Sequence, residues 1–295
     1  MVNSISFKRN PGINDLIEKV NNSYISSIKE IVMQLITVIN DPKSGAKDLR
    51  KIIEKDPPLT AGLLRLANSA YYGFQREISE IQEAIVAIGF NTVKELALAQ
   101  KVCEIFKKDG DFEGYSRIGL WKHSFAVAFC NKLTYMREFR ESGETIFTAG
   151  LLHNLGVIVE DQFMHNKFKD VLVKVKKDNC NLIQAEKSIF GYNHADIGKA
   201  ITNNWKFPEE LVWAVGKHHE PEKVDDKYKK IILTSYVSDY ICQRNAIGYC
   251  DAPEENHSLY TKCLTELQIK EEAMNLIVED VLEEILKMEK GGWFQ

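Results

Sequence analysis

Apolar residues recur at intervals of three and four along nearly the whole chain of 295 residues, which is the spacing of amphipathic helices. The clearest run, at residues 28–39, predicts a helix over about 13–40. Asp41-Pro42 ends this helix because the residue before a proline avoids the helical conformation. No alternating pattern of useful length predicts a strand, so the fold class is predicted to be all-α.

Glycine, proline and polar residues divide the same pattern into shorter helices. They are predicted at about 49–53, 59–70, 81–88, 92–106, 117–138, 144–160, 165–178, 182–190, 195–204, 208–219, 229–244 and 268–289. Residues 245–265 are expected to form a loop. The polar, glycine-containing segment 107–114 predicts a boundary between an N-terminal helical half, 1–112, and a C-terminal half, 113–295.

The composition, 44% hydrophobic and 27% charged, is that of a globular chain that can bury a core. A net charge of −4 provides no basic field for nucleic acids, so no nucleic-acid partner is predicted. The polar N-terminus lacks the apolar region of a signal peptide. The longest apolar stretch, 146–159, is shorter than the roughly 20 residues that span a bilayer. A cytoplasmic location without membrane contact is therefore expected, and the six irregularly spaced cysteines are expected to be reduced thiols.

The histidines carry the candidate chemistry, because several stand in apolar helical surroundings. The residues concerned are His123, His153, His194, His218, His219 and Asp239. A buried carboxylate is costly unless it is paired or bound to a metal. Imidazoles and a carboxylate that meet from several helices are a common metal site in helical proteins. Each histidine alone is more often a packed or capping residue, and His165 and His257, in polar surroundings, are expected at the surface.

The order His, His-Asp, His, His-His, Asp on successive helices is similar to the ligand pattern of the two-metal HD-domain phosphohydrolases. Asn154 here replaces the Asp that follows their second histidine. Upstream, residues 53–74 and 78–89 closely resemble the N-terminal signature of the HDOD family, the HD-related output domain. Together these stretches cover most of 15–245. The resemblance implies a multi-helix HD-domain-like bundle with an additional N-terminal helical half, in which 113–295 is the HD-like half and ends in an acidic helix.

The resemblance also implies how the metal chemistry has changed. In the related phosphohydrolases the Asp of the His-Asp pair bridges two metals, whereas the amide of Asn154 is neutral and a poor ligand for hard cations. His123, His153 and Asp239 could still make one three-ligand site, and His194, His218 and His219 a second cluster. We expect at most one transition metal (Fe, Zn, Ni or Mn), or none.

Other signs of catalysis are missing from the sequence. Val157 stands where active relatives often have a lysine, and the residues after His219 lack the Gly-Tyr-Pro motif of the subgroup that cleaves cyclic di-GMP. The resemblance thus favours a bacterial signal-transduction output or scaffold protein that contacts other signalling proteins. The alternatives are a metal-dependent phosphohydrolase or phosphodiesterase acting on nucleotides or cyclic dinucleotides, and a metal or small-molecule sensor. A nucleotide-like ligand is compatible with the pattern.

The segment 68–74 allows two interpretations. Its polar and aromatic side chains could line a binding surface on the N-terminal half. Alternatively, Asn68 and Ser69 cap the preceding helix while the tyrosines seal the interface between the halves, which is the interpretation we favour.

Overall fold

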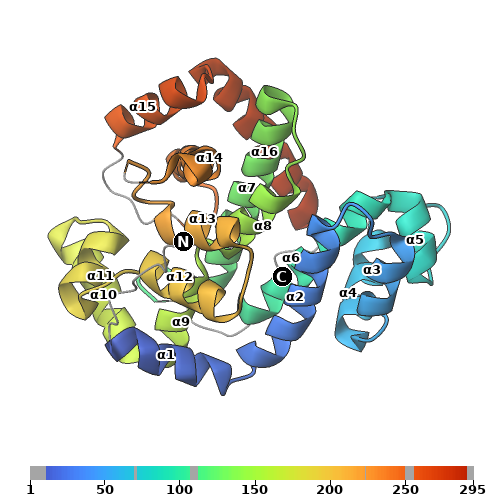
Figure 1. Cartoon of the computed structure of the whole chain (residues 1–295), viewed down its shortest axis with the longest axis horizontal. Coiled ribbons are helices and arrows are strands. Elements are labelled where there is room, and N and C mark those ends of the chain that lie inside the picture. The colour runs from blue at the N-terminus through green and yellow to red at the C-terminus, as the bar shows by residue number, and fades with distance from the viewer. Residues whose placement is uncertain (1–10, 70–71, 107–111, 223, 250–255, 291–295) are drawn as a thin grey trace, which may run out of the picture.

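The computed structural model describes residues 11–69, 72–106, 112–222, 224–249 and 256–290, and over these residues it contains helices and no strand (Figure 1). In chain order the elements are α1 (Pro11–Asn21), α2 (Ile25–Asn40), α3 (Ala46–Ile53), α4 (Pro57–Ala67), α5 (Ile81–Ile88), α6 (Phe90–Phe106), α7 (Arg117–Thr134), the π-helical turn η1 (Tyr135–Phe139), α8 (Glu144–Leu152), α9 (Leu155–Phe163), α10 (His165–Asp178), α11 (Leu182–Phe190), α12 (His194–Asn204), α13 (Glu209–Lys217), α14 (Asp226–Arg244), α15 (His257–Leu267) and α16 (Glu271–Lys290). The predicted all-α class is confirmed.

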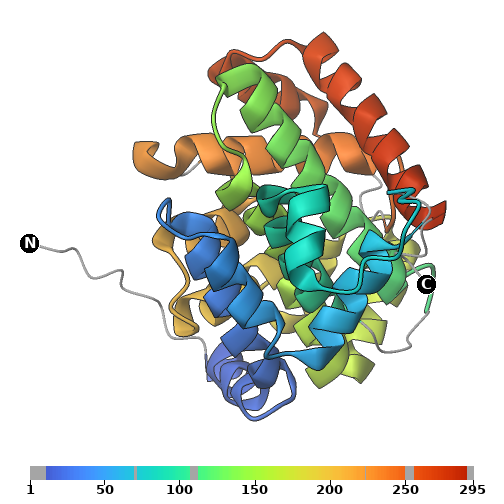
Figure 2. The same ribbon diagram turned by 90° about the vertical axis from the view of Figure 1, so that its right-hand side faces the viewer.

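The helices are arranged around a central group formed by α7, α8, α13 and α14. In Figure 1, α3, α4 and α5 stand to one side, and α6 joins them to the rest of the molecule. Figure 2 shows α16 running along the outside of α7. Buried apolar side chains form one large continuous cluster that extends from Leu16 in α1 to Met288 in α16. Burial of this cluster is the main source of stability because it removes apolar surface from water.

Helix α6 carries buried charged residues, each paired with an opposite charge. Lys94 contacts Glu144 of α8 at 2.9 Å, and Glu95 contacts Lys132 of α7 at 2.6 Å. Lys101 contacts Asp56, beside α4, at 2.5 Å. Unpaired buried charges would be strongly destabilising, so these contacts restrict the way α6 can sit between the two groups of helices.

The single helix predicted over 13–40 is wrong in one respect, because the chain breaks between α1 and α2. Ser23 donates its hydroxyl to the carbonyl of Val20 at 2.8 Å and accepts the backbone N–H of Ile25 at 3.2 Å. A serine side chain that bonds to nearby backbone in this way competes with the helical hydrogen bonds. The apolar pattern continues across the break, which is why it predicts one helix.

Two further predictions need correction. The helix predicted over 144–160 is divided into α8 and α9 at His153 and Asn154. The loop predicted over 245–265 contains α15, which begins after Asn256, whose side chain accepts the N–H of Leu259. The predicted boundary segment 107–114 lies outside the described residues at 107–111, and the division into 1–112 and 113–295 stays a prediction.

Two smaller expectations concern membranes and cysteines. Among the described helices, none is both long and apolar enough to cross a bilayer. Among the described residues, no disulfide is formed by Cys103, Cys130, Cys180, Cys242 or Cys263. Cys250 lies outside the described residues.

Gly150 permits the close approach of α8 to α7, and we expect Gly150→Ala to lower the free energy of unfolding by about 2 kcal/mol. A Cβ at this position would lie 2.4 Å from the Cα of Ala128, which outweighs the gain in helix propensity of about 1 kcal/mol. Urea unfolding followed by circular dichroism measures the change. In the control Gly45→Ala the new methyl meets open space, so the loss should stay below about 1 kcal/mol. Equal losses in both variants would contradict the packing argument.

Candidate metal centre

Five histidines and one aspartate, all singled out in the sequence, meet in one interior region. The distances between ring centroids are 5.6 Å for His123–His153, 5.0 Å for His153–His218, 5.5 Å for His194–His218, 4.9 Å for His194–His219 and 3.9 Å for His218–His219. Asp239 lies 2.8 Å from the ring of His123. These residues therefore share one site, and their role as metal ligands stays a prediction.

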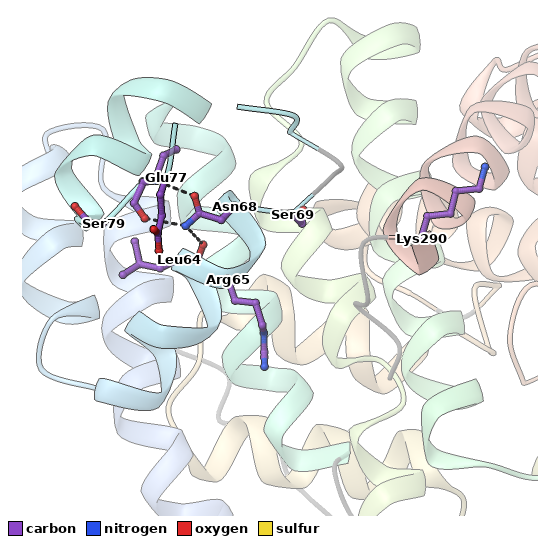
Figure 3. A pocket seen from close by; sticks show the side chains of 8 residues that line it. Leu64, Arg65, Asn68, Ser69, Glu77, Ser79 and Lys290 are labelled. Carbon is purple, nitrogen blue, oxygen red and sulfur yellow. Dashed lines mark hydrogen bonds between the residues drawn. The ribbon is translucent and has the colours of Figure 1, made fainter. Parts of the chain in front are cut away.

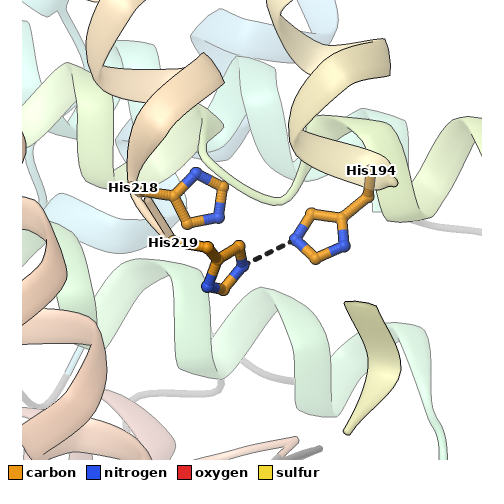
Figure 4. A group of neighbouring side chains, drawn as sticks. All are labelled: His194, His218 and His219. Atoms are coloured by element: carbon orange, nitrogen blue, oxygen red, sulfur yellow. Dashed lines mark hydrogen bonds between the residues drawn. The ribbon is translucent and has the colours of Figure 1, made fainter. Parts of the chain in front are cut away.

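Each side chain reaches the site from a different position on its helix. His123 and Asp239 stand within α7 and α14, which pack against each other. His153 caps the C-terminus of α8, and His194 is the first residue of α12. His218 caps the C-terminus of α13 and is followed by His219; Figure 4 shows both rings facing that of His194.

Two of the rings are held by the helix that they terminate. The Nδ1 of His153 bonds to the carbonyl of Gly150, and the Nδ1 of His218 bonds to the carbonyl of Val215, both at 2.7 Å. Carbonyls in the last turn of a helix lack a partner within the helix, so a histidine three residues later can satisfy one of them. Because Nδ1 must carry the hydrogen in this contact, Nε2 is left with a free lone pair.

His123 is held by the loop that follows α14. Its Nδ1 bonds to the carbonyl of Ile247 at 3.1 Å, and its Nε2 faces Asp239 Oδ1 at 2.8 Å. Both ring nitrogens thus face oxygen acceptors, which calls for two N–H groups or for a cation in place of the Nε2 proton. The loop turns through Gly248 at a φ of +80°, where a Cβ would lie 2.4 Å from the carbonyl oxygen of Gly119.

His194 is clamped by a buried carboxylate. Both oxygens of Glu186 lie 2.9 Å from its Nδ1, and one of them also accepts its backbone N–H at 3.0 Å. On the other side of the ring, His194 Nε2 lies 2.9 Å from His219 Nε2, the contact drawn in Figure 4. The hydrogen on Nδ1 leaves the Nε2 of His194 as an acceptor, so His219 is the donor in this contact.

The donor atoms fall into two sets that could each hold a metal ion. His194, His218 and His219 form one, and His123, His153 and Asp239 form the other, with the donor atoms of each set within 4.8 Å of one another.

Two buried nitrogens support a cation in this region. The Nε2 atoms of His153 and His218 have no hydrogen-bond partner among the described residues. Buried polar atoms are rarely left unpaired, and neutral imidazole is the form that binds metals. The chemistry of both sets suits a transition metal such as zinc, iron or nickel.

Burial keeps these rings neutral. It lowers the pKa of His153 to about 4 and that of His219 to about 3, and it holds the pKa of His218 well below the ordinary value. Burial alone would raise the pKa of Asp239, but the hydrogen bond with His123 and the electrostatic influence of the surrounding imidazoles outweigh it and lower that pKa. A carboxylate beside neutral imidazoles is a donor combination ready for a divalent cation.

Neutral groups line the space between the two sets. A cavity of about 10 Å³ lies against both His123 and His219, and its wall includes Asn154, Gln243 and Val157. This volume has room for about one water molecule. The amide of Gln243 also donates to Asp239 Oδ1 at 3.0 Å.

Gly156 of α9 sets the distance between α9 and α12, the helix that begins with His194. A Cβ at this position would lie 2.0 Å from the carbonyl oxygen of His194, so α9 and α12 can approach this closely only at a glycine. After the break at His153 and Asn154, the helix predicted over 144–160 continues as α9, which packs against α12.

Three residues that hold the site were missed in the sequence. Gln243 stands four positions after Asp239 on α14, which is a signal for a shared helix face. Glu160 interrupts the apolar run of α9 and is fully buried, so its position was a signal of the same kind as Asp239. Glu186 meets His194 only through the turn between α11 and α12, and no pattern in the sequence indicates this contact.

The two predicted surface histidines and the segment 68–74 lie away from the centre. His165 and His257 are exposed, as predicted. Asn68 ends α4, and its amide bonds to the backbone of Leu64 and Ile78, which Figure 3 shows at the edge of an open groove of about 590 Å³. The capping interpretation is confirmed for Asn68, whereas Tyr71 lies outside the described residues.

The HDOD domain family matches this chain over residues 25–221. This span covers two thirds of the sequence and includes five of the six donor residues. The chain therefore belongs to the HDOD family.

Solved structures share the fold. An HDOD domain protein of unknown function from Geobacter sulfurreducens is 26% identical, with a TM-score of 0.75 over 88% of this chain and 90% of that one. A protein from Shewanella amazonensis SB2B, provisionally named a phosphohydrolase, is 25% identical, with a TM-score of 0.67 over 90% of this chain and 93% of that one. A protein from Marinobacter aquaeolei VT8, provisionally named a signal transduction protein, is 19% identical, with a TM-score of 0.74 over 99% of this chain and 67% of that one. The HD-domain-like helical fold is thus confirmed.

Among the curated proteins, an uncharacterized protein of Treponema pallidum (strain Nichols) is 24% identical over 220 residues. The match covers 71% of this chain and 40% of that protein. The chain thus spans less than half the length of this relative.

We expect His153 to make the chelator-treated protein less stable in acid. Its folded pKa of about 4 lies below its unfolded value near 6.5, so the unfolded state binds the extra proton, and stability falls as the pH drops from about 6.5 to about 4. Between pH 7 and pH 5 this contribution is about 2 kcal/mol. Urea unfolding at both pH values should show a loss smaller by that amount in His153→Gln than in the unsubstituted protein. An identical loss in the two proteins would show that His153 is not held neutral.

Proposed function

We propose that this HDOD protein is a signal-transduction output module whose histidine centre holds at most one transition metal and does not hydrolyse nucleotides. The observation that carries the proposal is the small cavity between the two donor sets, walled by the neutral amides of Asn154 and Gln243 and by Val157. A phosphohydrolase needs room for a phosphate at its metals and positive groups around it. This cavity has space for about one water molecule, and the polar groups in its wall include two uncharged amides.

Charge supports the limit of one metal. Two divalent cations a few ångströms apart repel each other strongly, and a bridging carboxylate offsets that repulsion. At position 154 the chain offers an amide, and Asp239 is already engaged by His123 and Gln243. The centre therefore has enough negative charge for one cation and too little for a pair.

The role as an output module rests on the family and on the arrangement of its helices. HDOD proteins resemble phosphohydrolases in fold, and one structural relative bears a provisional signal-transduction name. Other signalling proteins would be the partners of this module. Their contacts with the helices on either side of α6 would be transmitted to the histidine centre. A cytoplasmic location and an action in a bacterial regulatory pathway belong to the same proposal.

The second candidate function is a metal-dependent phosphohydrolase acting on nucleotides or cyclic dinucleotides. The observation that favours it is the presence of two complete three-residue donor sets. A third candidate, a metal or small-molecule sensor, would use the same donors to bind an ion without turnover. The metal content and the activity of the protein separate these functions.

We expect the purified protein to bind at most one equivalent of transition metal, and Asn154→Asp to bind more. The new carboxylate would face both donor sets and offset the repulsion between two cations. Inductively coupled plasma mass spectrometry after loading with Zn²⁺ or Mn²⁺ measures the content. Asn154→Ala is the matched control, because it removes the amide without adding charge, and its content should not rise. Two equivalents in the unsubstituted protein would favour the enzyme.

We also expect negligible hydrolysis of cyclic dinucleotides and nucleoside monophosphates by the metal-loaded protein. The cavity admits about one water molecule, so a phosphate cannot reach the donor atoms without displacement of the surrounding helices. Chromatographic separation of substrate and product after long incubation provides the measurement. Robust turnover that disappears in His153→Ala would refute the output-module proposal.

A further inference from the structure

A pair of glutamates behind the histidine centre is not explained by the proposed function. Glu186 on α11 and Glu160 on α9 are fully buried. The two carboxyl oxygens of Glu160 have no hydrogen-bond partner among the described residues, and Glu186 is the neighbouring acidic group that acts on its pKa. Two buried carboxyl groups in contact cannot both be charged without a large electrostatic cost.

The contacts decide which member of the pair is charged. Glu186 accepts two N–H groups from His194, one from the ring and one from the backbone. These bonds stabilise a carboxylate. Burial raises the pKa of Glu160 well above its ordinary value, and the neighbouring charge of Glu186 raises it further, so Glu160 is the neutral member of the pair.

We propose that Glu186 is a positioning residue that makes His194, His218 and His219 the half of the centre that holds a divalent transition metal, with Glu160 as its neutral support. This inference rests on the proposed function, because it assigns the single metal to one of the two donor sets. The site would take a borderline cation that accepts imidazole nitrogens, such as Zn²⁺, Co²⁺ or Ni²⁺.

Geometry supports this assignment. The bond from His194 Nδ1 to Glu186 fixes the plane of the ring and leaves Nε2 directed at His219, as Figure 4 shows. The Nε2 of His218, buried and without a hydrogen-bond partner among the described residues, belongs to the same set. A carboxylate that accepts from the outer nitrogen of a metal-binding histidine orients the ring and makes it a stronger donor.

Charge distinguishes the two donor sets as well. In the other set, Asp239 Oδ1 is already engaged by His123 Nε2 at 2.8 Å and by the amide of Gln243 at 3.0 Å. A metal there would have to take the place of the contact between His123 Nε2 and Asp239. Behind His194, the oxygens of Glu186 bond to the ring and backbone N–H groups of His194 and to no cationic side chain of the described residues, so a divalent ion at the three imidazoles would offset the charge of Glu186. Glu186 thus supplies, from the second layer, negative charge that Asn154 does not.

The test compares Co²⁺ and Zn²⁺ affinity in single-residue variants. Glu186→Gln keeps the shape of the side chain and removes its charge, so the affinity should fall about 10- to 100-fold. Competition with a chromophoric chelator at pH 7.5 measures it, and the visible spectrum of bound Co²⁺ reports the ligand geometry. Glu160→Gln is the matched control. It replaces a neutral donor by another neutral donor at the same place, and the affinity should change less than about threefold.

Asp239→Asn tests the assignment to one set. If the metal is held by the three histidines, the affinity of this variant should stay within about threefold of the unsubstituted protein. A loss of binding in Asp239→Asn together with unchanged binding in Glu186→Gln would overturn the inference and leave the proposed function standing. No binding by the unsubstituted protein would also overturn it, whereas two bound equivalents would overturn the proposed function instead.

Folding is controlled separately, because Glu186 is buried. Thermal unfolding of the chelator-treated variants by circular dichroism identifies any that lose their structure. If Glu186→Gln is unfolded, Glu186→Asp takes its place, because it keeps the charge and shortens the reach to His194. A folded Glu186→Asp protein should show weaker binding and an altered Co²⁺ spectrum, and unchanged values would overturn the inference.

Discussion

The hydrogen bond on the outer nitrogen of four of the five rings is the interaction on which the histidine centre depends. Ile247, Gly150 and Val215 provide backbone carbonyls for three rings, and Glu186 provides a carboxylate for a fourth. Each bond assigns the hydrogen to Nδ1 and directs Nε2 inward. The rest of the fold serves these acceptors, because helix ends, one loop and one neighbouring helix must be in place for the rings to face one another.

The imidazole rings of the centre are firmly oriented, whereas the space between the two donor sets carries little negative charge. In a two-metal hydrolase, negative groups lie between the cations, where they also organise the attacking water. Here the space between the sets is bounded by amides, and the charged groups stand at its edges, with Asp239 on one side and Glu186 behind the other. Under the proposed function, such an arrangement would stabilise one cation better than a pair of cations.

Much of the fold and of the site could be predicted because the evidence was local. Apolar spacing indicates most helices, and His123 and Asp239 stand out because a polar group in an apolar helix face requires a partner. The breaks at Ser23 and at His153 could not be predicted, since the apolar pattern runs through both. α15 was missed although Tyr260, Cys263 and Leu264 follow the helical spacing. The role of Glu186 arises from the turn between two helices, which periodicity does not describe.

Helix α8 connects the ion pairs of α6 with the histidines. Its first residue, Glu144, holds Lys94, and His153 caps its other end. A helix of nine residues is about 14 Å long and nearly incompressible along its axis. A push on the lobe formed by α3, α4 and α5 that tilts α6 would therefore reach the imidazole of His153 as the movement of a rigid rod, and strain at that imidazole would travel back to the lobe by the same route.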